Sequence, residues 1–189
     1  MGKIKKPHLH PVEKSGSLEN IFRYKLQNPQ KILARYIKPG MTVLDFGCGP
    51  GFFTIAIAGL LKNSGKIIAA DLQSGMLEQL RLKINATTFK DIIQVHQTQE
   101  HTLNLTGKVN FAVAFYSFHE VAYLDNIIDE IKSLLQPDGK IFIAEQRFHV
   151  PKSSFNAIVD KIKEYGFEIT ERPKVFFSRA VVMKLIEQH

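Results

Sequence analysis

The segment VLDFGCGPGFF, residues 43 to 53, constrains the fold more than any other part of the chain. It joins an apolar, β-rich run to an amphipathic stretch through three glycines on alternate positions, Gly47, Gly49 and Gly51. In doubly wound α/β folds, a glycine-rich turn between the first strand and the first helix lets the backbone approach a ligand. The segment therefore predicts an open, mainly parallel sheet with a ligand at the carboxyl end of its first strand.

Short β-rich runs alternate with amphipathic stretches from residue 41 onward, which is typical of a parallel sheet with crossover helices. The runs predict strands over residues 42–46, 66–71, 92–96, 110–116 and 140–145. The amphipathic stretches predict helices over residues 52–62, 74–86 with Ser74 as its cap, 121–135 and 153–165. Between the last two strands, the segment QPDGK (136–140) predicts a turn that ends one helix and starts a strand.

The tail of the chain has a different pattern. Two β-rich runs, 167–170 and 175–186, are separated only by ERPK. A connection this short joins antiparallel strands, because it cannot hold a crossover helix. The predicted fold is therefore a three-layer α/β/α, doubly wound arrangement around a mostly parallel, seven-stranded sheet with an antiparallel last strand.

Length and composition limit the class of protein. The chain has 189 residues, enough for one well-buried core and too few for two full domains. No apolar run reaches the length of a membrane span, and the N-terminus lacks the apolar stretch of a signal peptide. The single cysteine, Cys48, excludes an internal disulfide framework and a thiolate metal cluster. We expect a cytoplasmic protein with no membrane partner.

The positive charge is concentrated at one end. Residues 1–38 hold nine Lys or Arg and two Glu, whereas residues 39–189 hold sixteen basic and sixteen acidic residues. We therefore separate a basic N-terminal arm, residues 1–38, from a main domain, residues 39–189. The arm has a helical part, residues 18–38, broken at Asn28 and Pro29. It suits an anionic substrate or a nucleic acid, and a solvated terminus is the alternative.

Residues around the glycines indicate which ligand the turn holds. Phe52 stands where the dinucleotide fingerprint has its third glycine or alanine, and no Gly-Lys-Ser/Thr follows for a phosphate loop. Asp45 lies two residues before Gly47, where it would repel a pyrophosphate and attract an ammonium group. Asp71 ends the second predicted strand, where a carboxylate accepts hydrogen bonds from ribose hydroxyls. A cationic amino-acid end joined to an adenosine end describes S-adenosylmethionine (SAM).

Four motifs together resemble a class I SAM-dependent methyltransferase. They are D-x-G-x-G-x-G after the first strand, an acid ending the second, FYSFHEV after the fourth and LLQPDGKIFIAE leading through the fifth. The resemblance runs from about residue 30 to the C-terminal hairpin and includes the antiparallel last strand. It implies SAM as the methyl donor and S-adenosylhomocysteine as the product, with residues 39–189 as the methyltransferase domain and residues 18–38 as a lid over cofactor and acceptor.

The resemblance also implies which residues bind the cofactor. Asp45 and the loop from Gly47 to Gly51, Cys48 and Gly49 included, should contact the amino-acid part. Asp71 should bind the ribose, with Leu72 beside the adenine. Gln99 or Glu100 is the candidate for the adenine amino group, and Tyr116 should also border the cofactor. Cys48 reads more simply as a small packing residue than as a nucleophile.

The acceptor side is expected at the carboxyl ends of the fourth and fifth strands. His119 is the candidate general base or orienting group, assisted by Glu120 or Tyr116, and the alternative is that it only caps the following helix. The rim after the fifth strand offers Glu145, Arg147 and His149 as acceptor-binding groups, and the last strand adds Arg179, of unknown orientation.

No metal site is expected. HEVAY lacks the second histidine of a zincin helix, and the His8 and His10 pair has no acidic or cysteine companion. The favoured function is methyl transfer to an unidentified small molecule, by in-line displacement at the cofactor methyl. Two alternatives are an RNA methyltransferase that uses the basic arm and a SAM-binding protein without catalysis. Against the first, FYSFHE lacks the Asn/Asp-Pro-Pro-Tyr/Phe pattern of base-amino methylases.

Overall fold

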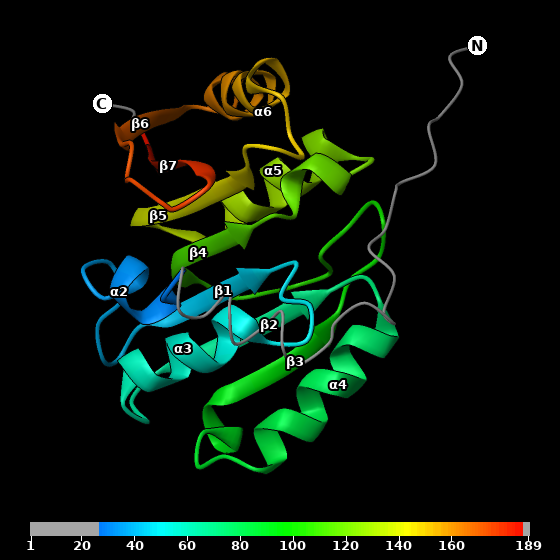
Figure 1. Cartoon of the computed structure of the whole chain (residues 1–189), viewed down its shortest axis with the longest axis vertical. Coiled ribbons are helices and arrows are strands. Elements are labelled where there is room, and N and C mark those ends of the chain that lie inside the picture. The colour runs from blue at the N-terminus through cyan, green and yellow to red at the C-terminus, as the bar shows by residue number, and fades with distance from the viewer. Residues whose placement is uncertain (1–26, 187–189) are drawn as a thin grey trace.

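A seven-stranded sheet lies between two helical layers in the computed structural model, which describes residues 27–186 (Figure 1). The strands are β1 (Thr42–Phe46), β2 (Lys66–Asp71), β3 (Ile93–Gln97), β4 (Val109–Phe115), β5 (Leu135–Gln146), β6 (Phe167–Glu171) and β7 (Ser178–Leu185). The helices are α2 (Pro29–Leu33), α3 (Phe52–Leu61), α4 (Ser74–Asn85), α5 (Leu124–Leu134) and α6 (Lys152–Glu164), with short 3-10 turns η2 (Lys90–Ile92) and η3 (Phe118–Glu120).

The strand order is β3-β2-β1-β4-β5-β7-β6. The first five strands pair in parallel, whereas β7 is antiparallel to both of its neighbours, β5 and β6. This confirms the predicted doubly wound sheet and its antiparallel last strand. The carboxyl ends of β1, β4 and β5 point to the same side of the molecule, to the right in Figure 1.

Alternation along the strands divides the core between the two faces of the sheet. One face carries Leu44, Ala112 and Ile143, which cluster with the apolar residues of α5 and α6. The other carries Val43 and Val113, which cluster with α2, α3 and α4. Because successive side chains of a strand point to opposite faces, buried strands that are apolar throughout serve both layers at once.

Most predicted elements agree with the structure to within a few residues, and three details were wrong. The helical part predicted to run to residue 38 ends at Leu33, the last residue of α2. Ser74 is the first residue of α4 and not its cap; the cap position is Gln73, whose side chain makes no capping bond. The predicted turn at QPDGK lies inside β5, where the β4 partners jump from Val109↔Leu135 to Phe111↔Lys140. The extra residues bulge out of the ladder, so that one irregular strand replaces the expected turn and strand.

The helix α2 belongs to the core of the fold. Pro29 occupies its first turn, and the Asn28 side chain accepts a hydrogen bond from Lys31 N, so Asn-Pro starts this helix. Leu33 and Ile37 are buried in the cluster with α3. Residues 18–26 of the expected lid lie outside the described residues. Within residues 27–186 no helix is both long and apolar enough to span a bilayer.

Replacing Phe142 with alanine should lower the free energy of unfolding by about 3–5 kcal/mol, because its ring is fully buried and stacks on Phe115 at 5.6 Å. Urea denaturation followed by circular dichroism measures the change. The matched control is Leu82→Ala, since Leu82 is 74% exposed and should change stability by less than about 0.5 kcal/mol. Equal effects of the two substitutions would contradict the assignment of the core.

Candidate active site

The glycine loop, residues 47–51, connects β1 to α3 through three glycines with positive φ, at 68°, 53° and 88°. A Cβ on Gly47 would lie 2.4 Å from Ser117 Cβ, and one on Gly51 would lie 2.4 Å from Leu80 Cδ1. Gly47 and Gly51 are therefore required by the close packing of the loop. At Gly49 a Cβ would meet nothing within 4 Å, so this glycine faces open space.

The amide groups of the loop are used inside the protein. Gly47 N and Cys48 N both donate to Ala70 O, at 2.8 and 3.1 Å. Gly49 N donates to Asp71 Oδ2 at 2.8 Å, and Gly51 N to Cys48 O at 3.1 Å. Pro50 has no N–H, so every amide of the loop is accounted for. A loop of this kind has no donors left to cradle a phosphate, which separates it from dinucleotide and phosphate loops.

Asp45 lies at the base of the loop and is 2% exposed. Thr54, in the first turn of α3, donates Oγ1 to Asp45 Oδ2 at 2.6 Å. Burial raises the pKa of Asp45 to about 7; the Thr54 hydrogen bond acts against this shift and the charge of Asp71 adds to it. Thr54 was not among the predicted site residues, because its partnership with Asp45 depends on how α3 packs.

Asp71 ends β2 beside the loop and accepts Gly49 N and Gln73 N, one on each carboxylate oxygen, both at 2.8 Å. Burial raises the pKa of Asp71, against the opposing effect of the backbone N–H groups of Gln73, Gly49 and Leu72. Each oxygen keeps a lone pair for a further donor. With Asp45, this places two buried carboxyl groups around the loop, an arrangement suited to a ligand with a cationic end and hydroxyl donors.

The predicted contacts with the adenine lie in the segment that follows β3. Gln99 and Glu100 are exposed and lie in a narrow turn in which Gln99 pairs with Thr102. Two residues that were not predicted lie closer to the end of β2. Gln97 Nε2 donates to Leu72 O at 3.2 Å, and the buried Thr98 donates its N–H to Asp71 O at 3.0 Å.

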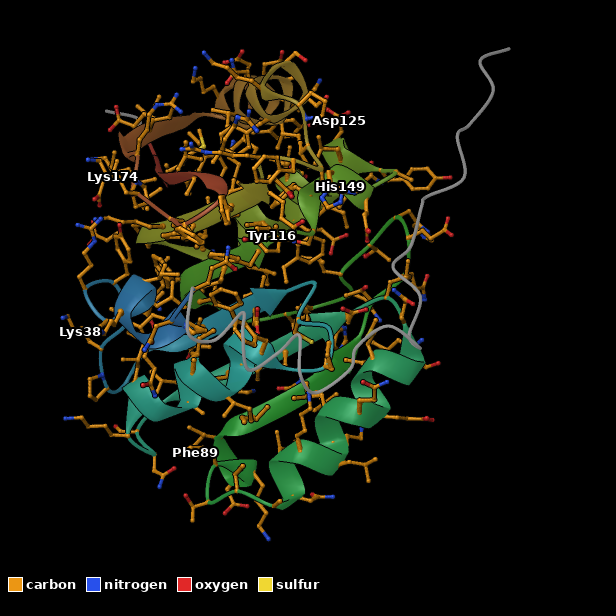
Figure 2. The ribbon with its side chains drawn as sticks, viewed as in Figure 1. Lys38, Phe89, Tyr116, Asp125, His149 and Lys174 are labelled. Carbon is orange, nitrogen blue, oxygen red and sulfur yellow. The ribbon has the colours of Figure 1, made fainter. Side chains whose placement is uncertain are left out.

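Tyr116, at the end of β4, has a φ of +62°, which is unusual for a bulky residue and is held here by a hydrogen bond from its N–H to Ala144 O. Its hydroxyl shares a 2.6 Å hydrogen bond with Ser178 Oγ and accepts one from Gln27 Nε2 at 2.5 Å. Figure 2 shows Tyr116 near the middle of the molecule. The three residues come from distant parts of the chain, which is why neither Gln27 nor Ser178 was predicted.

His119 and Glu145 form a hydrogen-bonded pair at the carboxyl ends of β4 and β5. Glu145, fully buried, accepts His119 Nδ1 at 2.8 Å and His119 N at 3.2 Å. Burial lowers the pKa of His119, but its hydrogen bond to Glu145 and the charges of Glu145 and Glu120 outweigh burial and raise the pKa above its ordinary value. Nε2 has no hydrogen-bond partner within residues 27–186, and the nearest carboxylate oxygen, of Glu120, lies 3.8 Å away. The structure thus brings together a base candidate and a group that orients it.

The remaining rim residues divide into two groups. His149 packs its ring edgewise on His119, with 4.9 Å between centroids, so it borders the same site (Figure 2). Arg147 is exposed and donates Nε to Ser178 O at 2.9 Å. Arg179 donates to Val150 O at 2.8 Å, so its guanidinium is bonded to the β5–α6 connection.

Cys48 is buried, and burial, with the charges of Asp45 and Asp71, raises the pKa of its thiol. A neutral, enclosed thiol favours a packing role over a nucleophile. Within the described part of the chain, no group of three or more His, Cys, Asp or Glu side chains could hold a metal ion. His8 and His10 lie outside that part.

A protein-family model described as a methyltransferase domain matches residues 17–172. The chain is 26% identical over 158 residues to the demethylmenaquinone methyltransferase of Symbiobacterium thermophilum, covering 77% of this chain and 63% of that protein. It is 32% identical over 110 residues to the enzyme of the same name from Lactobacillus johnsonii, covering 58% and 45%. The chain thus spans between 45% and 63% of the length of these curated relatives.

Solved structures share the fold. A SAM-dependent methyltransferase from Aquifex aeolicus superposes with a TM-score of 0.84 at 23% identity, covering 94% of this chain and 100% of that one. The architecture of sheet and helices therefore matches that of class I methyltransferases, in agreement with the expectation from the motifs.

The raised pKa of Asp45 predicts a pH dependence of stability. A carboxyl that binds its proton more tightly in the folded state makes the free energy of unfolding rise as the pH falls from about 7 to about 4. Relative to Asp45→Asn, which cannot titrate, the wild type should gain up to about 1.4 kcal/mol per pH unit in this range. Urea denaturation of both proteins at several pH values measures the difference. A difference that does not change between pH 7 and 4 would contradict the shift.

Proposed function

The chain belongs to the methyltransferase-domain family and has the class I fold of SAM-dependent methyltransferases, and on that premise we propose that it transfers the methyl group of SAM to a small-molecule acceptor. The proposed site is the carboxyl edge of the sheet, around the ends of β1, β2, β4 and β5. The cytoplasmic location expected from the sequence is part of the same proposal.

One observation carries the proposal: the glycine loop presents carboxyl groups where phosphate-binding loops present amides. Asp45 and Asp71 are both buried beside it, and all its N–H groups are bonded internally. A ligand with a positive charge and ribose hydroxyls can interact favourably with these two carboxyl groups, whereas a pyrophosphate would be repelled by them. Gly49, with open space beside it, leaves room for the ligand to approach the backbone.

The roles proposed for the cofactor residues follow from their positions. Asp45 and the glycine loop serve the amino-acid end, and Asp71 serves the ribose through the lone pairs that Gly49 N and Gln73 N leave unused. Leu72 is proposed to border the adenine. We retain Gln99 and Glu100 as candidates for binding the adenine amino group. The buried Thr98 supports this segment by bonding its N–H to Asp71 O.

SAM supplies an electrophilic methyl group, so the protein has to orient the acceptor, exclude water and remove a proton where the acceptor carries one. His119 Nε2 is proposed to accept that proton, because Nδ1 is held by Glu145 and Nε2 has no hydrogen bond to the described residues, 27–186. Glu145 is then a positioning residue that fixes the ring and stabilises its protonated form. Glu120, whose carboxylate lies 3.8 Å from Nε2, is proposed to border the same position, and Tyr116 is proposed to assist from the end of β4.

The acceptor is proposed from the relatives. Both curated relatives are named demethylmenaquinone methyltransferases, so demethylmenaquinone is the first molecule to test. We propose that segment 18–38 selects the acceptor, because Gln27, within it, reaches Tyr116 through its side chain. Arg147 and His149 are proposed rim contacts. The RNA alternative depends on the basic arm, most of which lies outside the described residues, so an RNA acceptor belongs in the same screen.

SAM and S-adenosylhomocysteine should both raise the melting temperature, because a ligand at about 100 times its Kd stabilises the folded state by about 2.7 kcal/mol. Asp71→Asn should weaken SAM binding by about tenfold or more, measured by calorimetry at a temperature where the variant is folded. The control is Asp138→Asn, an exposed acid in the bulge at the amino end of β5. No response of the wild type to either ligand would refute the proposed function.

Replacing His119 with glutamine should reduce kcat by about 10²–10⁴ for an acceptor that must lose a proton, with little change in SAM affinity.

In the wild type, kcat/KM should rise with pH through a value above the ordinary histidine pKa, because the base must be neutral. Glu145→Gln removes the charge that raises this pKa, so in this variant the rise of kcat/KM with pH should occur at a lower pH than in the wild type. The control is His101→Gln, at an exposed histidine in the connection after β3. If His119→Gln leaves kcat unchanged and Glu145→Gln leaves the pH profile of kcat/KM unchanged, His119 has only a structural role.

A further inference from the structure

Three phenylalanines form an exposed cluster beside the proposed site. Phe148, in the β5–α6 connection, is 86% exposed, and Phe176 and Phe177, in the β6–β7 connection, are 46% and 52% exposed. Ring centroids lie 5.4 Å apart for Phe148 and Phe177 and 4.0 Å apart for Phe176 and Phe177. Single exposed apolar residues are ordinary on a protein surface, but a contiguous apolar group marks an interaction site.

The backbone under the cluster is held by hydrogen bonds. Phe177 has a φ of +52°, a conformation that bulky residues rarely adopt. Its carbonyl accepts Arg147 N at 2.9 Å, Arg147 Nε donates to Ser178 O at 2.9 Å, and Gln27 Nε2 donates to Phe176 O at 2.7 Å. These bonds tie the two connections to each other and to the site. The backbone that carries Phe176 and Phe177 is therefore held in place by hydrogen bonds, although Phe177 has an unfavourable φ.

The cluster is flanked in the sequence by basic residues. The segments QRFHVPK (146–152) and RPKVFFSR (172–179) contain five Lys or Arg and no Asp or Glu. Four of them are exposed: Arg147, Lys152, Arg172 and Lys174. Figure 2 labels His149 and Lys174, which lie on the β5–α6 and β6–β7 connections respectively. We call the three phenylalanines and these four cations the aromatic–basic patch.

We propose that the aromatic–basic patch docks on a phospholipid bilayer that carries anionic headgroups. Phenylalanine has no polar group to hydrate, so three clustered rings gain free energy by entering the boundary between headgroups and acyl chains. Lysine and arginine around them pair with anionic headgroups, each strengthening the attachment. The earlier expectation of no membrane partner was based on the lack of a long apolar run, which peripheral docking does not require.

The geometry favours a bilayer over a nucleic acid. Aromatic residues that bind single strands present open ring faces on which successive bases stack. Here the rings are tilted against one another, at 50° for Phe176 and Phe177 and at 59° for Phe148 and Phe177, so they form one apolar group and not a row of parallel faces. That shape suits insertion better than stacking.

The patch is connected to the acceptor side of the site by hydrogen bonds of one residue. Gln27 joins the two, since its Nε2 donates both to Phe176 O and to the hydroxyl of Tyr116. Docking would therefore hold the carboxyl edge of β4 and β5 close to the bilayer, where an acceptor dissolved in the membrane could enter. This last consequence rests on the proposed function, whereas the docking itself does not.

Vesicle flotation tests the docking with the full chain. Vesicles of phosphatidylcholine alone and of phosphatidylcholine mixed with phosphatidylglycerol are the probes. Wild-type protein should bind the mixed vesicles about tenfold more tightly, and added salt should weaken that binding. Phe148→Ser with Phe177→Asn should weaken it by about tenfold or more, with asparagine chosen because it tolerates positive φ. Arg172→Gln with Lys174→Gln should weaken it by about tenfold. Leu82→Ser, at a residue 74% exposed on α4, is the matched control and should bind as the wild type does.

Circular dichroism and the melting temperature of each variant establish that it is folded. The proposal is overturned if the wild type fails to float with the mixed vesicles, or if the phenylalanine variant floats as well as the wild type. Salt-sensitive binding of oligouridine without vesicle binding would assign the patch to nucleic acid, and a dimer broken by the phenylalanine variant, again without vesicle binding, would assign it to a second copy. Binding to vesicles without any thermal response to SAM would refute the proposed function and leave the docking intact.

Discussion

The hydrogen bond from Gly49 N to the Asp71 carboxylate is the interaction on which the candidate cofactor site depends. It draws the glycine loop onto the end of β2, where Gly47 N and Cys48 N also bond to Ala70 O. The loop then lies against neighbouring segments so closely that side chains at Gly47 and Gly51 would collide with them. Both carboxyl groups are buried: Asp45 lies in the central strand β1 against Thr54 of α3, and Asp71 lies against the loop through Gly49 N.

The acceptor side follows a different principle, since it is assembled from segments far apart in sequence. Tyr116 connects to Gln27 and Ser178, which are 151 residues apart, and His119 is oriented by Glu145 of the next strand. The two buried side-chain atoms without a hydrogen-bond partner in residues 27–186 are Gln27 Oε1 and His119 Nε2. Both atoms belong to the acceptor side of the site, so they could form hydrogen bonds with a bound acceptor.

Local patterns could be read from the sequence, and tertiary ones could not. The strands over 42–46 and 66–71 were predicted to the residue, because continuous apolar runs mark strands covered on both faces. The predicted strand ends also place the two acids, because Asp45 is the residue before the end of β1 and Asp71 is the last residue of β2. Ser74 was misjudged as a cap because nothing local distinguishes a capping residue from the first residue of a helix. Thr54 carries no local signal of its contact with Asp45, nor does Gln27 of its contact with Tyr116.

The placement of β7 between β5 and β6 has a consequence for synthesis on the ribosome. Residues 167–171 emerge before 178–185, yet β6 pairs with the sheet only through β7. Until the later strand has left the ribosome, β5 presents an open edge and β6 has no partner, and unpaired strand edges favour association between chains. The later strand thus completes the sheet, so a nascent chain stalled before residue 178 would hold five paired strands and an unpaired edge on β5.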